Sequence, residues 1–338
     1  MNFNAIEWKS YKESERGKEV ILLFTESDSK SLQYDILNRF NPYQTNLFDK
    51  EYIRNYITQF KAQFFTDLKP LQEVTEARDF YHALINKAFV DTSDGKNSIN
   101  YKAVIEHQSL LSFLFFDYYP ELFIPNLFTY NTVKLLELAE AFKLHLPKTT
   151  KKEKYKERCD YYIDLCEELY FFKEEHELTP YELCAFIYDY APTVIAENKT
   201  EETLPKALQA WFVNDFDNKK EKDLKLPYWC TNTEVKKGDI LLFYQKGLQN
   251  AITHIATATR DAIIDPFTEV YSYTTRTTPI SIPSITLQEM KQDVYLSAHP
   301  AIIKSFREPV STLTYDEYGR VLELIKTKKG DLSLLPTL

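Results

Sequence analysis

Residues that could catalyse a reaction form only fragments of known motifs in this sequence. Glu7, Trp8 and Lys9 match the acid-x-Lys end of the PD-(D/E)xK nuclease motif. Such a nuclease also needs a second acid, on a neighbouring strand, to hold the metal ion that activates water. No acid and no strand pattern precede Glu7, so this fragment does not predict a nuclease.

A second group of reactive side chains is the run Glu174-Glu175-His176-Glu177. Its residue types suit a metal, but adjacent residues on a helix point in different directions and do not converge on one ion. We interpret the run as the solvated end of a helix. The sequence contains no H-E-x-x-H, G-x-S-x-G, Walker or G-x-G-x-x-G pattern. We therefore predict no catalytic residue, no metal and no cofactor, and favour a non-catalytic role, with a hydrolase of unfamiliar type as a weaker alternative.

Composition limits the compartment and the partners of the chain. A formal net charge of -9 over 338 residues argues against a protein that coats nucleic acid by charge alone. The most hydrophobic run, residues 110–128, is interrupted by charged residues and proline and is too polar to span a membrane. We expect a cytoplasmic protein with reduced thiols, because its four cysteines form no C-x-x-C pair and follow no signal peptide: Cys159, Cys166, Cys184 and Cys230.

The first 199 residues are predicted to be mainly helical. Apolar residues recur at three- and four-residue steps through residues 53–64 and 71–88, which is typical of amphipathic helices. Residues 101–119 indicate one thick aromatic helix, and Asn131 can cap another that runs to about residue 144. Thr179 and Glu182 form a capping box, so residues 180–190 are expected to be helical, with Cys159 and Cys166 on a buried stripe.

From residue 200 onward the pattern changes to short strands separated by turn residues. Gly238 and Asp239 form a turn that leads into five apolar or aromatic residues, which indicates a buried strand. The capping boxes that start at Thr286 and Thr314 predict two short helices. The expected strands lie at residues 206–213, 229–231, 240–244, 252–259, 270–275 and 280–282.

The order of these features resembles the EVE domain of the PUA-like fold over about residues 203–328. The resemblance rests on Trp229, the Gly238-Asp239 turn and its strand, the small-residue strand 251–258, and Asp265-Pro266-Phe267. The Lys-rich stretch that usually follows the first tryptophan of an EVE domain is absent, and Cys230-Thr231-Asn232 stands there instead. The helical half of the chain has no part in the resemblance.

The resemblance implies a small β-barrel with a pocket for one nucleobase, often a modified one, in DNA or RNA. A base turned out of its stack is held between rings and read along its edge by hydrogen bonds. Trp229 and Tyr244 are possible walls of such a pocket, although both could equally be barrel core. Asn232 could contact the base edge or simply make a turn, and His254 could face the ligand or be a structural residue. Phe267 could border the site or pack inward.

Four basic residues could hold the phosphates on either side of such a base, although isolated surface cations are usually just solvated. They are Lys236, Lys237, Arg276 and Arg307.

We therefore predict an α+β protein with a helical domain over residues 1–199 and a PUA-like, EVE-like barrel over residues 200–338. The expected function is recognition of a modified base without catalysis, in a bacterial restriction or phage-defence setting. The alternative is an interaction subunit that docks a defence nuclease or ATPase through its helical half and uses the barrel as scaffold.

Overall fold

The computed structural model shows an α+β chain that divides into two compact units. Unit 1 comprises Met1–Thr200 together with Asp265–Glu269, and unit 2 comprises Glu201–Ile264 and Val270–Leu338. The structure describes residues 3–26, 30–41, 48–66, 68–91, 98–129, 131–151, 153–198, 204–214, 228–247, 249–265, 272–308 and 310–338. Within these ranges, the side chains of residues 30–32, 197–198, 228–230 and 273 are not described. No helix among the described residues has the length and apolar character needed to cross a membrane.

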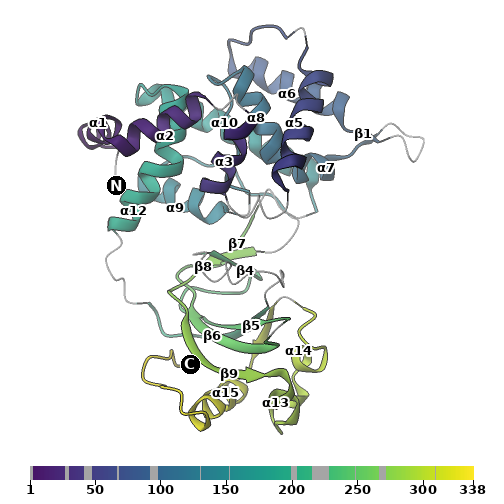
Figure 1. Ribbon diagram of the computed structural model, residues 1–338, viewed down its shortest axis with the longest axis vertical. Coiled ribbons are helices and arrows are strands. Elements are labelled where there is room, and N and C mark those ends of the chain that lie inside the picture. The colour runs from purple at the N-terminus through teal and green to yellow at the C-terminus, as the bar shows by residue number, and fades with distance from the viewer. Residues whose placement is uncertain are drawn as a thin grey trace. The chain divides into compact units, whose positions relative to one another are not determined.

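The described part of unit 1 is built from helices and a two-stranded antiparallel sheet of β1 (Val90–Asp91) and β2 (Ser98–Ile99). Figure 1 shows these helices in purple to teal. They are α1 (Ala5–Glu13), α2 (Glu15–Thr25), α3 (Lys30–Phe40), α5 (Lys50–Phe64), α6 (Val74–Ala88), α7 (Tyr101–Glu106), α8 (Gln108–Tyr118), α9 (Thr132–Phe142), α10 (Tyr155–Glu175), α11 (Pro180–Ala185) and α12 (Ala191–Asn198).

Most of the predicted helices are confirmed. Helices α5 and α6 bury the apolar residues that recur at helical spacing in the sequence. The expected single helix over residues 101–119 is wrong, because the chain breaks at His107 between α7 and α8. Helix α9 begins after Asn131 as expected, but the Asn131 side chain makes no capping hydrogen bond, and the helix ends at Phe142.

The capping box at Thr179 and Glu182 is present, and it starts α11 with Pro180 at the first helical position. The helix then widens into a π-helical turn, Phe186–Tyr190, before it continues as α12. Such turns often lie at functional sites. Here the turn holds Asp189, a buried carboxylate that faces α1 and α2.

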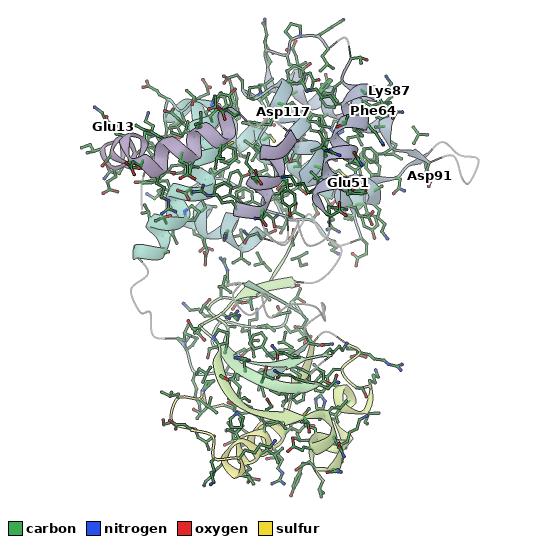
Figure 2. The ribbon with its side chains drawn as sticks, viewed as in Figure 1. Glu13, Glu51, Phe64, Lys87, Asp91 and Asp117 are labelled. Atoms are coloured by element: carbon green, nitrogen blue, oxygen red, sulfur yellow. The ribbon has the colours of Figure 1, made fainter. Side chains whose placement is uncertain are left out.

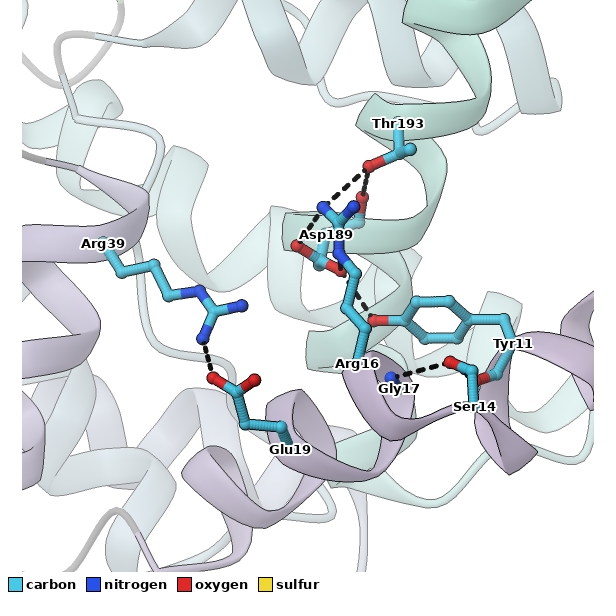
Figure 3. A network of polar contacts seen from close by, with 8 residues as sticks. All are labelled: Tyr11, Ser14, Arg16, Gly17, Glu19, Arg39, Asp189 and Thr193. Atoms are coloured by element: carbon cyan, nitrogen blue, oxygen red, sulfur yellow. Dashed lines mark hydrogen bonds and ion pairs between the residues drawn. The ribbon is translucent and has the colours of Figure 1, made fainter.

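Asp189 anchors the hairpin of α1 and α2 (Figure 3). Arg16 donates from Nε and Nη2 to the two carboxylate oxygens of Asp189, each at 2.8 Å. The Tyr11 hydroxyl also donates to Asp189, at 2.9 Å. Burial, followed by the bond to this carboxylate, raises the pKa of Tyr11 above its ordinary value. The phenol therefore remains a donor at neutral pH and holds α1 in place.

The turn between α1 and α2 requires a glycine. The Gly17 amide donates to the Ser14 hydroxyl at 3.0 Å, and Ser14 donates in turn to the Tyr11 carbonyl at 2.6 Å (Figure 3). A β-carbon at Gly17 would lie 1.9 Å from that carbonyl oxygen. The two helices approach so closely that no other residue fits at position 17.

Aromatic rings and the three cysteines described in this unit fill its core. Cys159, Cys166 and Cys184 are buried and free, as the helical pattern of the first two predicts. At the surface of α5 and α6, Lys87 Nζ lies 5.9 Å from the centroid of the Phe64 ring (Figure 2). In such a contact the aliphatic part of the lysine side chain covers the ring, while the ammonium group stays near water.

The residues described in unit 2 form two sheets. One has five strands in the order β10-β3-β5-β6-β9, and the other has three in the order β4-β8-β7. Strands β3 and β5 are parallel, whereas the other neighbours are antiparallel. The strands are β3 (Ala210–Asn214), β4 (Tyr228–Thr231), β5 (Ile240–Gln245), β6 (Ala251–Thr257), β7 (Ile263–Ile264), β8 (Ser272–Thr275), β9 (Ile280–Thr286) and β10 (Val310–Leu313).

Each predicted strand overlaps an observed one, although the first begins at residue 210 and not at 206, and residues 270–271 lie outside the described residues. The closed barrel expected from the resemblance is not present among the described strands. Among the described strands, β10 and β9 are the two open edges of the five-stranded sheet. An isolated bridge between Ala258 and Arg276 links the end of β6 to the end of β8. The two sheets that the structure describes do not form one continuous ladder.

The predicted Gly238-Asp239 turn is confirmed, and it joins β5 to its neighbours. Gly238 adopts a φ of +98°, and its amide donates to the Ala258 carbonyl at 2.8 Å. The buried carboxylate of Asp239 accepts from three donors, namely the Trp211 indole and the amides of Gln209 and Lys236. Strand β5 therefore starts at a fixed point.

One face of the five-stranded sheet is covered by α13 (Leu287–Gln292), α14 (Pro300–Ile303) and α15 (Tyr315–Thr327), drawn in yellow in Figure 1. The predicted capping boxes at Thr286 and Thr314 start α13 and α15. We call this side of the sheet the helix-covered face. Its core includes Phe212, Leu242, Tyr244, Ile252, Ile255, Met290, Ile302, Tyr318 and Val321.

Candidate functional site

Tyr244 lies in the core of unit 2 and not at the wall of an open pocket. Its side chain is 1% exposed and points to the helix-covered face. The ring stacks on Phe306, with centroids 3.7 Å apart and planes 9° from parallel. The ring of Tyr244 therefore stacks on Phe306, which follows α14, and not on a nucleobase.

His254 lies on the opposite face of the same sheet. It pairs with Phe243 across β5 and β6, so the two side chains point to one side. The sequence pattern places His254 with Ile252, Ala256 and Ala258, and for Ile252 this is wrong. A β-bulge at Thr253 turns Ile252 to the helix-covered face, whereas the two alanines share the side of Phe243.

We call this second surface the His254 face. Besides His254, it carries Trp211, Val213, Val235, Leu241, Phe243, Ala256 and Ala258.

Arg276 joins His254 at this face. Its guanidinium carbon lies 5.5 Å from the centroid of the Phe243 ring, and Nη1 donates to the Thr277 carbonyl at 3.1 Å. The side chain is only 9% exposed, and burial lowers the pKa of Arg276 to about 10, so the group stays charged at neutral pH. A charge this far from water does not fit the predicted role of a surface phosphate contact.

Burial and the neighbouring guanidinium determine the protonation of His254. Burial is the larger cause, and Arg276 the second, of a pKa below the ordinary value for histidine. The imidazole is therefore neutral at pH 7. Its Nδ1 lies 2.8 Å from the Thr253 hydroxyl. His254 and Arg276 therefore place a neutral ring and a buried cation on the same face of the sheet.

The remaining expected pocket residues are less completely described. Trp229 belongs to β4 and pairs with Thr274 of β8, two residues before Arg276, but its side chain is outside the described residues. Phe267 lies wholly outside them. Asn232 follows β4, and its side-chain oxygen accepts from the Glu234 amide at 2.9 Å. This bond matches the turn-forming role that the sequence offered as the alternative to base contact for Asn232.

The predicted phosphate contacts do not form one group. Lys236 pairs with Asp261, with Nζ and Oδ2 3.1 Å apart, and the Lys237 amide donates to the same carboxylate at 2.9 Å. Arg307 is exposed and directly follows Phe306, on the chain that covers the other face of the sheet. Of the four cations, Arg276 is the one for which the structure describes a place on the His254 face.

The structure thus brings together His254 and Arg276 and separates Tyr244 from them. It adds Phe243, whose ring supports the guanidinium and which the sequence marks only as one member of an apolar strand. The pairing of Phe243 with His254 depends on strand register. No local motif indicates that register.

Comparisons with known proteins give limited information. No family model and no curated protein matches the chain. Solved structures match about a third of it. One is Rpa0253 from Rhodopseudomonas palustris, with 18% identity, 36% of this chain and 94% of that chain covered, and a TM-score of 0.28.

Two further structures match to a similar degree. Atu2648 from Agrobacterium tumefaciens shows 17% identity over 34% of this chain and 92% of that one, with a TM-score of 0.29. A hypothetical protein from Leishmania major shows 14% identity over 36% of this chain and 96% of that one, with a TM-score of 0.28. At TM-scores this low, the likeness carries no argument about fold or function.

Proposed function

We propose that unit 2 is an EVE-like member of the PUA-like fold and reads one nucleobase, with a modified base in DNA or RNA as its ligand, on the His254 face. The observation that carries the proposal is the group formed by Arg276, Phe243 and His254. Arg276 is buried, His254 is partly buried, and both share this face with the small residues Ala256 and Ala258. Nucleobase recognition requires both elements, a ring to stack on and donors aimed at a base edge.

Each residue has a chemical role in this proposal. The guanidinium of Arg276 donates to the Thr277 carbonyl through Nη1, and in this proposal its planar group also faces the acceptors along a base edge. The neutral ring of His254 offers a surface for stacking. Trp229, on the strand beside β8, is the second stacking ring in this proposal. The restriction or phage-defence setting follows from the resemblance to EVE domains and is part of the same proposal.

A binding screen tests the proposal. The full chain is titrated into fluorescent oligonucleotides that carry N6-methyladenine, 5-methylcytosine or 5-hydroxymethylcytosine, with unmodified DNA and RNA of the same sequence alongside. One modified oligonucleotide should bind more tightly than its unmodified match. Arg276→Met keeps the aliphatic contact with Phe243 but removes the donors, so affinity should fall about fivefold to 150-fold.

Two further variants complete this test. Trp229→Ala should remove a stacking contact, which is worth roughly 1–3 kcal/mol per base, while the melting temperature stays within a few degrees. The matched control is Arg307→Met, an exposed arginine on the chain that covers the other face, and it should leave binding unchanged. Equal affinity of the native protein and the Arg276→Met and Trp229→Ala variants would contradict the proposal.

The ion pair of Lys236 and Asp261 favours the alternative function, an interaction subunit for a defence nuclease or ATPase. An acid beside the expected phosphate contacts neutralises them and reduces the attraction for nucleic acid. If no oligonucleotide binds at low salt, where charge attraction is strongest, the alternative is preferred. Co-purification of the tagged chain with a nuclease or ATPase from its native host would then support it.

A further inference from the structure

Unit 1 contains a cleft that the proposed function does not use. Its volume is about 560 Å³, which lies within the range of small-molecule sites. Apolar and aromatic side chains form part of its wall, and charged side chains form the rest. The lining residues are Phe3, Ala5, Trp8, Lys9, Lys12, Glu13, Ile21, His176, Glu177, Leu178 and Glu182.

Two chain segments hold the wall of the cleft in place. Helix α1 is capped by Asn4, whose side chain accepts from the Ile6 and Glu7 amides, and it is fixed to Asp189 through Tyr11. At the end of α10, Glu177 adopts a left-handed φ of 51°, and the Leu178 amide donates back to the Lys173 carbonyl at 3.0 Å. The cleft is therefore built from anchored backbone on both sides.

Aromatic rings offer this cleft a flat surface. The rings of Phe3 and His176 stack with centroids 4.2 Å apart and planes 16° from parallel. The expectation of a solvated helix end at residues 174–177 is thus wrong for His176. Burial lowers the pKa of His176, whereas Glu175 acts in the opposite direction, so the imidazole is neutral at pH 7. The stacked pair suits an uncharged planar ligand.

Trp8 supplies a hydrogen-bond donor that has no acceptor. Its side chain is 97% buried, since only 3% is exposed, and among the described residues its Nε1 has no hydrogen-bond partner. Buried polar groups without partners are rare in proteins, and a missing ligand atom or water is a common cause. A ring nitrogen or carbonyl oxygen of a heterocycle is an acceptor of the required kind.

The charges of the lining exclude an anionic ligand. Lys12 Nζ and Glu182 Oε1 form an ion pair at 2.8 Å. The remaining charges of the lining are one positive, on Lys9, and two negative, on Glu13 and Glu177. Two lysines and three glutamates together give a net charge of -1. A phosphate would be repelled on balance, because like charges in a partly enclosed site raise the free energy of binding.

We propose that this cleft binds an uncharged planar heterocycle of nucleobase or nucleoside size. The ligand stacks against the rings of Phe3 and His176 and accepts a hydrogen bond from Trp8 Nε1. The proposal concerns unit 1 and is independent of base reading by unit 2. It requires that nucleosides bind more tightly than the corresponding nucleotides.

Calorimetric titration of the full chain tests this proposal. The probes are adenosine, guanosine, cytidine and uridine, each compared with its 5′-monophosphate. At least one nucleoside should bind, and its monophosphate should bind more weakly. Trp8→Phe keeps a ring but removes the donor and should weaken nucleoside binding about twofold to tenfold, the worth of one hydrogen bond. The absence of binding by all four nucleosides, or tighter binding of the monophosphates, would overturn the proposal.

A blocking variant locates the site without disturbing the core. Ala5 is exposed and lines the cleft, so Ala5→Phe places a ring in the ligand's volume and should abolish nucleoside binding. Ile6→Phe is the matched control, because Ile6 is the next residue of α1, is 83% exposed and is not part of the lining. Unchanged affinity in Ala5→Phe, or equal loss in both variants, would overturn the assignment of the cleft.

Discussion

The indole of Trp211 donates a hydrogen bond from Nε1 to Oδ2 of Asp239 at 2.9 Å, across the parallel pair of β3 and β5. The same carboxylate also accepts from the amides of Gln209 and Lys236. Because Asp239 is buried, this one side chain satisfies donors from two segments of the chain. It fixes the register in which the central strands begin.

Removal of this carboxylate should destabilise unit 2 strongly. Asp239→Ala leaves three donors without acceptors, and each buried unpaired donor costs about 1–3 kcal/mol. We expect the free energy of unfolding to fall by about 3 kcal/mol or more, measured by urea denaturation. The control is Asp261→Ala, which breaks an exposed ion pair and should cost no more than about 1 kcal/mol. Equal effects of the two variants would contradict the structural role of Asp239.

Two glycines provide an opposed pair of predictions. Gly17→Ala places a β-carbon against the Tyr11 carbonyl and should destabilise unit 1 by about 1–3 kcal/mol or more. Gly319 lies inside α15 with no atom within 4 Å of an added β-carbon. Gly319→Ala should therefore stabilise the helix by about 0.5–1 kcal/mol. Thermal unfolding followed by circular dichroism measures both, and a shift of the same sign in the two variants would contradict the geometry.

The stack of Tyr244 on Phe306 predicts an effect on stability. Tyr244→Ala removes a ring from the core and should reduce the free energy of unfolding by about 3–5 kcal/mol. Tyr315→Ala, at a tyrosine that is 72% exposed, is the control and should stay within about 0.5 kcal/mol of the native protein. A native-like melting curve for Tyr244→Ala would show that this ring is not part of the core.

The lowered pKa of His254 predicts a dependence of stability on pH. Burial and Arg276 make protonation harder in the folded protein than in the unfolded chain, whose histidine pKa is near 6.5. Between the two pKa values the unfolded chain binds more protons. Stability from His254 is thus complete above about pH 6.5 and is lost as the pH falls through the folded pKa.

His254→Gln should remove this part of the pH dependence. Denaturant unfolding of both proteins at several pH values between 5 and 8 gives the difference in slope. His176 also has a lowered pKa, but it is present in both proteins and cancels from the comparison. Identical slopes in the native protein and in His254→Gln would mean that His254 is not held in its neutral form.

Features that depend on neighbouring residues were predictable from the sequence. The three capping boxes at Thr179, Thr286 and Thr314 are all present, because each is formed by a side chain and a backbone amide three residues away. The helical stripes of α5 and α6 follow for the same reason. The Gly238-Asp239 turn was also evident, although two of the three donors to Asp239 come from Trp211 of β3 and from Gln209 just before that strand.

Features that depend on pairing between distant segments were not predictable. Periodicity shows that β5 alternates its side chains, but not which face α13, α14 and α15 cover, so it could not decide between pocket wall and core for Tyr244. The bulge at Thr253 reverses the orientation of Ile252, and a bulge of this kind follows from the register of three strands together. The place of Arg276 above Phe243 joins β5 to the end of β8, which no local pattern indicates.

The pairing of β10 with β3 has a consequence for biosynthesis. Strand β3 is synthesised before the other strands described in its unit, yet one of its two neighbours, Val310–Leu313, is synthesised after all of them. Until then, β3 presents unsatisfied backbone groups along one side, which another nascent chain could pair with. Late closure of this kind leaves the edge of β3 open for longer than a connection between consecutive strands would.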